Sequence, residues 1–235
     1  MRMKKLVPLL CVLLISAATL IPWSSVRAID KQSQAEEIEY DVAKIFFEFN
    51  SNDNDLGLQV LLDGDDWNWL RITDPSGKRI VDMKVQSDLS KLGLTELFFE
   101  SAEPSPAEVL ALVEEGTYEF EGRTVEGDEL EGEAELSHTL PPVPSIIFPA
   151  MAGQVVDPSN TVIQWAAIGG IAGWEVIVEN EDVGAEMTVP LASTATSLHV
   201  PPEFLTPGTE YKVEVLAISL NGNKTIRERT FVTGP

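Results

Sequence analysis

The sequence predicts an all-β protein built from two tandem β-sandwiches, and three observations favour this fold class. Short segments of alternating apolar and polar residues are separated by clusters of Asn, Asp, Gly, Pro and Ser, as expected for antiparallel strands joined by turns. Three prolines among residues 141–144 interrupt the pattern, because proline favours extended geometry and cannot continue a sheet interior. A tight turn at residues 206–208 then delivers Tyr211 onto a strictly alternating strand, which is how a sandwich corner is built.

We expect three segments: a signal peptide over residues 1–28, an acidic β-sandwich domain over 29–140 and a second sandwich over 141–235. The whole chain has a net charge of −22. Residues 29–140 carry 28 acidic and 8 basic residues, whereas 141–235 carry 10 and 4, which favours a boundary near residue 140. This charge excludes nucleic acid as a partner and disfavours an anionic membrane surface, because both are bound through Lys and Arg.

The N-terminus has the pattern of a secretory signal peptide. Three basic residues within the first five positions precede an uncharged apolar run over 6–20, and Val26 and Ala28 supply small residues before a cleavage point. A membrane anchor is disfavoured, because the run is shorter than the roughly twenty residues of a spanning helix. We therefore expect export to the periplasm or the extracellular space, with no membrane span after cleavage. Cys11, the only cysteine, leaves with the signal, so the mature chain has no disulfide or thiolate site.

The first sandwich is predicted from its alternation and turns. The expected strands are Val42–Phe49, Leu56–Asp63, Trp67–Asp74, Lys78–Val85, Thr95–Glu100, Thr117–Val125 and Glu129–His138. A turn is expected at Asp63–Asp66 and a short helical turn at 87–92. Ser105 as N-cap, followed by Pro106 and by Glu108 at the third position, predicts a helix over Pro106–Val113. The pattern fits an immunoglobulin-like sandwich with one helical insertion.

The last two strands of this half predict an acidic outer face. Leu130, Ala134 and Leu136 alternate with glutamates, as Tyr118 and Phe120 do on the preceding strand. Both apolar faces align only when paired residue numbers sum to an even value, since a one-residue slip swaps the faces. That register requires a three-residue loop, Glu126–Asp128, or a bulge. Opposed like charges destabilise a strand pair, so the face must be solvated or neutralised by cations.

Residues 144–233 resemble a fibronectin type III domain. The resemblance is carried by four segments and their aromatic residues: Val162–Trp165 with Trp165, Gly173–Glu179 with Trp174, Ser197–Val200, and the strand that begins after the Tyr211 corner. Trp174 stands where the family usually has Tyr. The resemblance implies a binding or spacer module with Trp165, Trp174 and Tyr211 in structural roles, and it implies no enzymatic activity.

Two tryptophans form a candidate ligand site. Trp67 and Trp69 alternate onto one face with Arg71, whereas Leu70 and Ile72 take the other. If the Leu face is the core, the two indoles form an exposed platform for a glycan or a protein partner. If the Trp face is the core, they are packing residues. Arg71 favours the outward Trp face slightly.

Acidic turn residues form a candidate calcium site. Its members are Asp53, Asp55, Asp63, Asp65 and Asp66, from loops rich in the oxygen ligands that calcium prefers. Their order does not fit the EF-hand template. Asp55 and Asp63 also lie at opposite ends of one expected strand, so only loops from neighbouring hairpins could meet. Ordinary Asx turns are the competing interpretation.

Catalysis has little support in the sequence. His138 and His199 are the only histidines, and neither lies in a motif that supplies a nucleophile or an orienting acid. The abundant carboxylates single out no glycosidase pair. We therefore expect an exported, non-enzymatic binding or spacer protein that acts through protein–protein contacts and needs no cofactor. An accessory carbohydrate-binding protein, stabilised by calcium, is the alternative, and a hydrolase ranks third.

Overall fold

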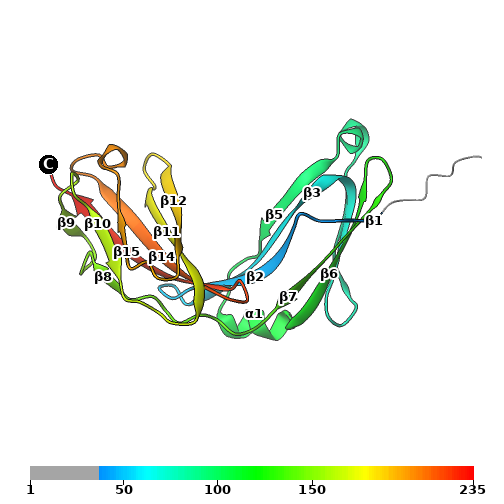
Figure 1. Cartoon of the computed structure of the whole chain (residues 1–235), viewed down its shortest axis with the longest axis horizontal. Coiled ribbons are helices and arrows are strands. Elements are labelled where there is room, and N and C mark those ends of the chain that lie inside the picture. Colours follow the sequence, from blue (N-terminus) through cyan, green and yellow to red (C-terminus); the bar gives the residue numbers. More distant parts are fainter. Residues whose placement is uncertain (1–36) are drawn as a thin grey trace, which may run out of the picture. The chain divides into compact units, whose positions relative to one another are not determined.

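The computed structural model describes residues 37–235 (Figure 1), and the predicted signal peptide lies outside these residues. Nearly all regular structure in this part of the chain is β-strand, as the sequence predicts. No helix within residues 37–235 is long and apolar enough to cross a membrane.

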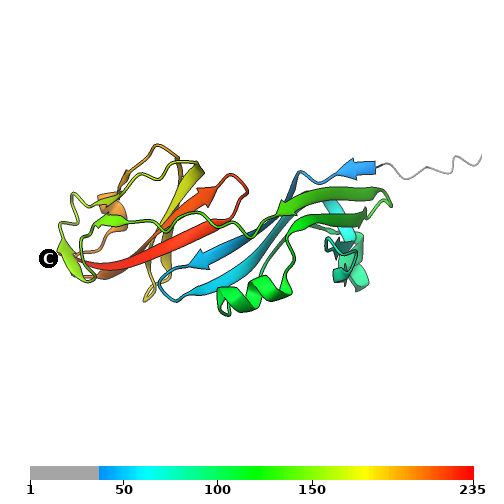
Figure 2. The ribbon, with the colours of Figure 1, turned by 90° about the horizontal axis from the view of Figure 1, so that it is seen from below.

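The first half is a β-sandwich with one α-helix. Its elements are β1 (Glu37–Glu39), β2 (Val42–Asn50), β3 (Asp55–Thr73), β4 (Arg79–Lys84), a 3-10 helix (Ser87–Lys91), β5 (Leu94–Glu100), α1 (Pro106–Leu112), β6 (Gly116–Thr124) and β7 (Glu129–Leu136). Helix α1, the green coil in Figure 2, joins β5 to β6. The predicted cap is present, because the Ser105 backbone amide donates to Glu108 Oε2 at 3.1 Å.

The predicted turn at Asp63–Asp66 is wrong. Strand β3 continues through these residues, and its first part pairs with β2 and β5 while its last part pairs with β4 and β6. The alternation of exposed and buried residues continues through this segment: Asp63 and Asp65 are exposed, and Gly64 between them is buried. A Cβ on Gly64 would lie only 3.1 Å from Tyr40 Cδ1. Glycine therefore permits close packing inside a continuous strand here, rather than a chain reversal.

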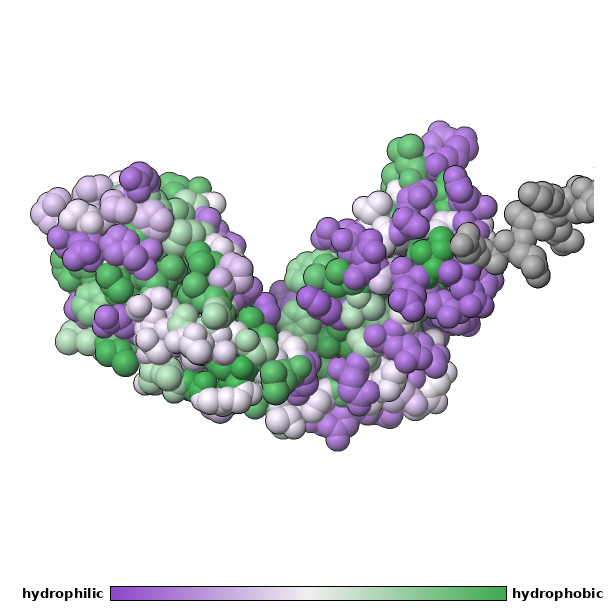
Figure 3. All heavy atoms as spheres, viewed as in Figure 1, coloured by the Kyte–Doolittle hydropathy of each residue, from purple (hydrophilic) through white to green (hydrophobic). Residues whose placement is uncertain are grey.

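The core of the first half lies between the layers that β3 connects. Its largest fully buried side chains are Phe47, Leu56, Leu62, Trp67, Leu70, Ile72, Tyr118, Phe120 and Leu130. Val109 adds the buried face of α1 to this cluster. Hydrophilic residues gather over the outside of this half in the view of Figure 3, consistent with its excess of acidic residues.

The second half is a sandwich of fibronectin type III-like strand order. Its elements are β8 (Ile146–Phe148), β9 (Gln154–Val156), β10 (Val162–Trp165), β11 (Ile171–Asn180), β12 (Ala185–Ala192), β13 (Ser197–His199), a 3-10 helix (Pro202–Phe204), β14 (Glu210–Ser219) and β15 (Lys224–Thr233). Strands β13, β10 and β8 form one sheet, and β12, β11, β14, β15 and β9 follow one another in the other. Trp165 and Trp174 are buried between them with ring centroids 5.7 Å apart.

The predicted tyrosine corner is present. The Tyr211 hydroxyl accepts a hydrogen bond from the Thr206 amide at 2.9 Å and donates to the Phe204 carbonyl at 3.2 Å. The ring is buried and stacks on Phe231 at a centroid distance of 5.6 Å. The hydroxyl thus forms hydrogen bonds with two backbone groups at the turn that precedes β14.

The two halves have separate hydrophobic cores and one continuous sheet. Strand β15 pairs in parallel with β2 over residues 224–226. Asn223 is fully buried at this junction, where its Oδ1 accepts from the Phe47 amide at 2.8 Å. Its Nδ2 donates to the carbonyls of Ser137 and Thr139 at 2.7 and 2.9 Å. The boundary at residues 140–141 stays a prediction.

Candidate functional site

The hairpin β6–β7 presents an acidic face in the predicted register. Glu119 pairs with Glu133 and Glu121 with Glu131, so each paired number sums to an even value, and the register is confirmed. The Thr124 amide donates to the Asp128 carbonyl at 2.9 Å and closes a three-residue loop over 125–127, one residue earlier than predicted. The glutamates of the two strands therefore lie directly opposite one another on the outer face.

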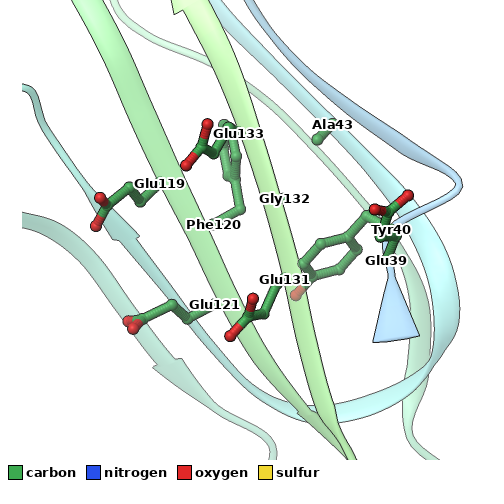
Figure 4. Close-up of a pocket in the computed structure, with 9 residues that line it drawn as sticks. All are labelled: Glu39, Tyr40, Ala43, Glu119, Phe120, Glu121, Glu131, Gly132 and Glu133. Carbon is green, nitrogen blue, oxygen red and sulfur yellow. The ribbon is translucent and has the colours of Figure 1, made fainter. Parts of the chain in front are cut away.

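Strand β1 extends this surface. It pairs in parallel with β7, which places Glu39 beside Glu131. The hollow at this point has a volume of about 660 Å³ (Figure 4). Its lining residues are Glu39, Tyr40, Ala43, Glu119, Phe120, Glu121, Glu131, Gly132 and Glu133. We call the five glutamates in this lining the acidic hairpin face.

Few cations neutralise the acidic hairpin face. Arg71 on β3 forms an ion pair with Glu121. Arg123 lies beside the face and pairs with Glu129, with 3.6 Å between Nη2 and Oε1. Within residues 37–235, no ion pair involves the side chains of Glu119 or Glu133. Charge repulsion between these opposed carboxylates is therefore uncompensated within the described part of the chain.

Tyr40 is a buried residue in the lining of this hollow (Figure 4). The side chain is 8% exposed, and its hydroxyl has no hydrogen-bond partner. Glycines make room for it: a Cβ on Gly122 would lie 2.2 Å from the hydroxyl, and one on Gly132 would lie 3.2 Å from Cδ2. Burial raises the pKa of Tyr40 well above its ordinary value, so the hydroxyl stays protonated. The only sequence signal for this contact is a glycine at an inward position of each strand.

The predicted shared face of Trp67, Trp69 and Arg71 is wrong. The pairing between β3 and β6 shifts by one residue between Trp67 and Trp69, which is a bulge and breaks the alternation. Trp67 is 0% exposed and belongs to the core, whereas Trp69 is half-buried. The Trp69 Nε1 donates to Asp82 Oδ1 at 3.0 Å, and Arg71 Cζ lies 5.3 Å from its ring centroid. Ligand contact by Trp69 and Arg71 stays a prediction.

The predicted calcium residues do not meet. Asp55 begins β3, whereas Asp63, Asp65 and Asp66 lie in the middle of the same continuous strand, so they are separated along it. The loop before β3 is an Asx turn, because the Asn52 amide donates to Asn50 Oδ1 at 2.9 Å and Asn50 Nδ2 donates to Asp53 Oδ2 at 3.3 Å. Over residues 37–235, no three Asp, Glu, His or Cys side chains are arranged as metal ligands.

The histidines occupy separate places. His138 Nε2 lies 2.8 Å from the Val113 carbonyl, and its ring packs at a centroid distance of 5.9 Å from Phe47. His199 ends β13 in the second half, where it pairs with Val162 on β10. The structure does not bring the two imidazoles into one site.

Comparisons with known proteins find similarity to solved structures only at low TM-scores and low sequence identity. No protein-family model and no curated protein matches the chain. Among solved structures, the chain is similar to the FN1–FN3 domains of chicken CNTN1, with 11% identity, a TM-score of 0.35, and coverage of 86% of this chain and 69% of that chain. A two-domain fibronectin type III segment of chicken tenascin has 12% identity and a TM-score of 0.31, with coverage of 83% of this chain and 99% of that chain. Fibronectin(III)-like modules of Clostridium thermocellum CbhA have 9% identity and a TM-score of 0.33, with coverage of 82% of this chain and 94% of that chain.

Proposed function

We propose that the chain is an exported, non-enzymatic binding or spacer protein that acts through protein–protein contacts, and that the acidic hairpin face is its contact surface. The observation that carries this proposal is the direct opposition of Glu119 to Glu133 and of Glu121 to Glu131. A partner that brings positive charge to this face would relieve the repulsion. We therefore propose a partner with a basic surface.

The geometry of the face favours a regularly spaced basic segment. Opposed Cα atoms in an antiparallel pair are about 4.5–5.5 Å apart, and alternate residues along a strand are roughly 6.5–7 Å apart. Lysines at alternate positions of an extended peptide repeat at the same spacing. Such a peptide could run along β6 and β7, parallel to the strands, with one ammonium group near each glutamate pair.

The test is a titration with a synthetic peptide that carries lysine at every second position. The hairpin variant, Glu131→Gln with Glu133→Gln, should bind this peptide at least tenfold more weakly than the unchanged protein. A distal variant, Glu203→Gln with Glu210→Gln, has the same net charge and alters two exposed residues of the second half. It should bind the peptide as the unchanged protein does. Equal losses in both variants would show only net-charge attraction and would contradict the assigned surface.

Export rests on the N-terminal pattern and has its own test. The mature protein collected from the periplasm or the medium should begin at Ile29 when its intact mass is measured. A mass that includes the first 28 residues would contradict cleavage.

A second candidate function is carbohydrate binding at Trp69. The half-buried indole lies in a shallow hollow with Asn68, Lys84 and Arg123, and polar groups beside an aromatic ring favour sugar hydroxyls. A glycan array should then show binding that Trp69→Ala removes. The hairpin variant should retain this binding, which separates the two candidate functions.

A further inference from the structure

A second group of carboxylates lies on the outer surface of β2, β3 and β5, away from the core side of these strands. Glu48 on β2 pairs with Gly57 on β3, and Glu100 on β5 pairs with Gln59. In the first part of β3, over residues 55–63, the buried apolar residues are the even-numbered ones, so the odd-numbered residues of this part share the outer face. We call the following residues the carboxylate cluster: Glu48, Asp55, Glu100 and Glu103.

The missing side chain of Gly57 leaves the space in which the carboxylate cluster meets. A Cβ on Gly57 would lie 3.2 Å from Glu103 Oε1 and 3.3 Å from Glu100 Oε1. Two carboxylates of different segments therefore converge above one glycine. Any larger residue at position 57 would occupy the point toward which both oxygens are directed.

Backbone contacts fix the segment that carries Glu103. The Leu56 amide donates to the Pro104 carbonyl at 3.0 Å, and the Ser101 amide donates to the Leu58 carbonyl at 2.9 Å. The Leu58 amide donates in turn to Ser101 Oγ at 2.9 Å. The approach of Glu103 to Glu100 is therefore set by the fold of this segment.

The lysine beside Glu48 of the carboxylate cluster, Lys224, already forms ion pairs with two carboxylates. Lys224 Nζ lies 3.4 Å from Glu48 Oε2 and 2.9 Å from Glu175 Oε1. Among the ion pairs of residues 37–235, none involves Asp55, Glu100 or Glu103. Burial raises the pKa of Glu103, and the neighbouring charges of Glu100, Asp55 and Glu48 raise it further. Burial and then Asp53 raise the pKa of Asp55.

Two buried oxygens at the cluster have no hydrogen-bond donor. They are Asp55 Oδ1 and Gln59 Oε1. Gln59 is only 4% exposed, and its Nε2 donates to Glu100, so its amide group lies at the cluster. Leaving a buried polar atom unpaired is costly, and a cation satisfies an oxygen acceptor as a donor would. The unpaired oxygen of Gln59, which is not one of the carboxylates, indicates a ligand independently of the acidic residues.

We propose that Asp55, Gln59, Glu100 and Glu103 bind a divalent cation, and that this cation is calcium. All the donors are oxygens, which Ca²⁺ takes in groups of six to eight with water completing the shell, whereas zinc and copper prefer nitrogen and sulfur. No three acidic side chains of residues 37–235 already surround a single point. Glu100 and Glu103 converge over Gly57, and rotation of the Asp55 side chain toward them completes the protein ligands.

This site differs from the calcium site that the sequence predicts and from the acidic hairpin face. It shares Asp55 with the former and no residue with the latter. Its carboxylates come from β3, from β5 and from the segment after β5, so a bound ion would fasten that segment to the sheet. The proposal does not depend on the basic partner proposed above.

The test is a calorimetric titration of CaCl₂ into the metal-free purified protein at constant ionic strength, with the unfolding midpoint measured in parallel. We expect one saturable site and a higher midpoint with calcium. The cluster variant, Glu100→Gln with Glu103→Gln, should lose both effects. The distal variant should keep both, although it removes the same number of charges.

Gly57→Ala provides a second variant in which every ligand remains. The added methyl group meets only the ends of flexible side chains, so the fold should persist by circular dichroism while calcium affinity falls at least tenfold. Absence of saturable calcium binding in the unchanged protein would overturn the proposal, and so would unchanged binding in the cluster variant. The hairpin variant should bind calcium normally, so failure of this proposal is distinguishable from failure of the proposed function.

Discussion

The opposed glutamates of the acidic hairpin face predict a stability that depends on salt. Two unit charges about 5 Å apart repel by roughly 0.8 kcal/mol in bulk water. Interactions between exposed charged side chains amount to about 0.2–1 kcal/mol, and Arg71 offsets part of the repulsion at Glu121, so the two pairs Glu119–Glu133 and Glu121–Glu131 together cost about 1 kcal/mol at low ionic strength. At about 0.15 M salt the Debye length is roughly 8 Å, which reduces this cost by about half.

The hairpin variant removes one charge from each pair. It should therefore raise the free energy of unfolding by about 1 kcal/mol at low salt and by about half as much at physiological salt. The assay is urea denaturation at both sodium chloride concentrations, with the distal variant as control. If the hairpin variant keeps the salt slope of the unchanged protein, these carboxylates do not interact and the reasoning is refuted.

Three further predictions follow from buried or crowded polar groups. Tyr211→Phe leaves two backbone groups at the corner without their partner and should destabilise the protein by roughly 1–3 kcal/mol in urea denaturation; an unchanged midpoint would contradict the corner contacts. Asn223→Ala leaves the buried Phe47 amide and the part-buried Ser137 carbonyl without this partner, while the Thr139 carbonyl keeps its hydrogen bond from Asn221 Nδ2 at 3.0 Å, so a loss of roughly 2 kcal/mol or more is expected by the same assay, and a loss below about 1 kcal/mol would show that water replaces the side chain. The raised pKa of Glu103 means that the folded state binds the proton more tightly than the unfolded state, so stability should rise as the pH falls from neutrality toward 4.5. Thermal melts should show a smaller rise in stability for the cluster variant. An identical pH dependence in the unchanged protein and the cluster variant would refute the mutual repulsion of these carboxylates.

Features set by local periodicity could be predicted from the sequence. The register of β6 and β7 follows from the alternation of Glu with apolar residues, and the cap of α1 follows from the spacing of Ser105 and Glu108. The Tyr211 corner is likewise encoded within one short segment. Each of these depends on residues that are close in sequence or on a single face of one strand.

Features set by packing between distant segments could not be predicted. Asp63–Asp66 has the composition of a turn, yet Gly64 is needed where Tyr40 packs against a continuous strand. A bulge in β3, opposite β6, separates Trp67 from Trp69, and no residue type near them indicates it. The carboxylate cluster was missed because Gly57 and Glu103 meet only through the fold of the segment after β5.

The most direct test of the central claim is to locate the bound basic peptide on the protein. Backbone amide shifts should be recorded by NMR while the alternating-lysine peptide is added at about 0.15 M salt. We predict that the perturbed amides cluster within β6, β7 and β1 and that the hairpin variant abolishes these shifts. Perturbations spread evenly over the acidic surface, or centred on the second half, would contradict the acidic hairpin face as the contact surface.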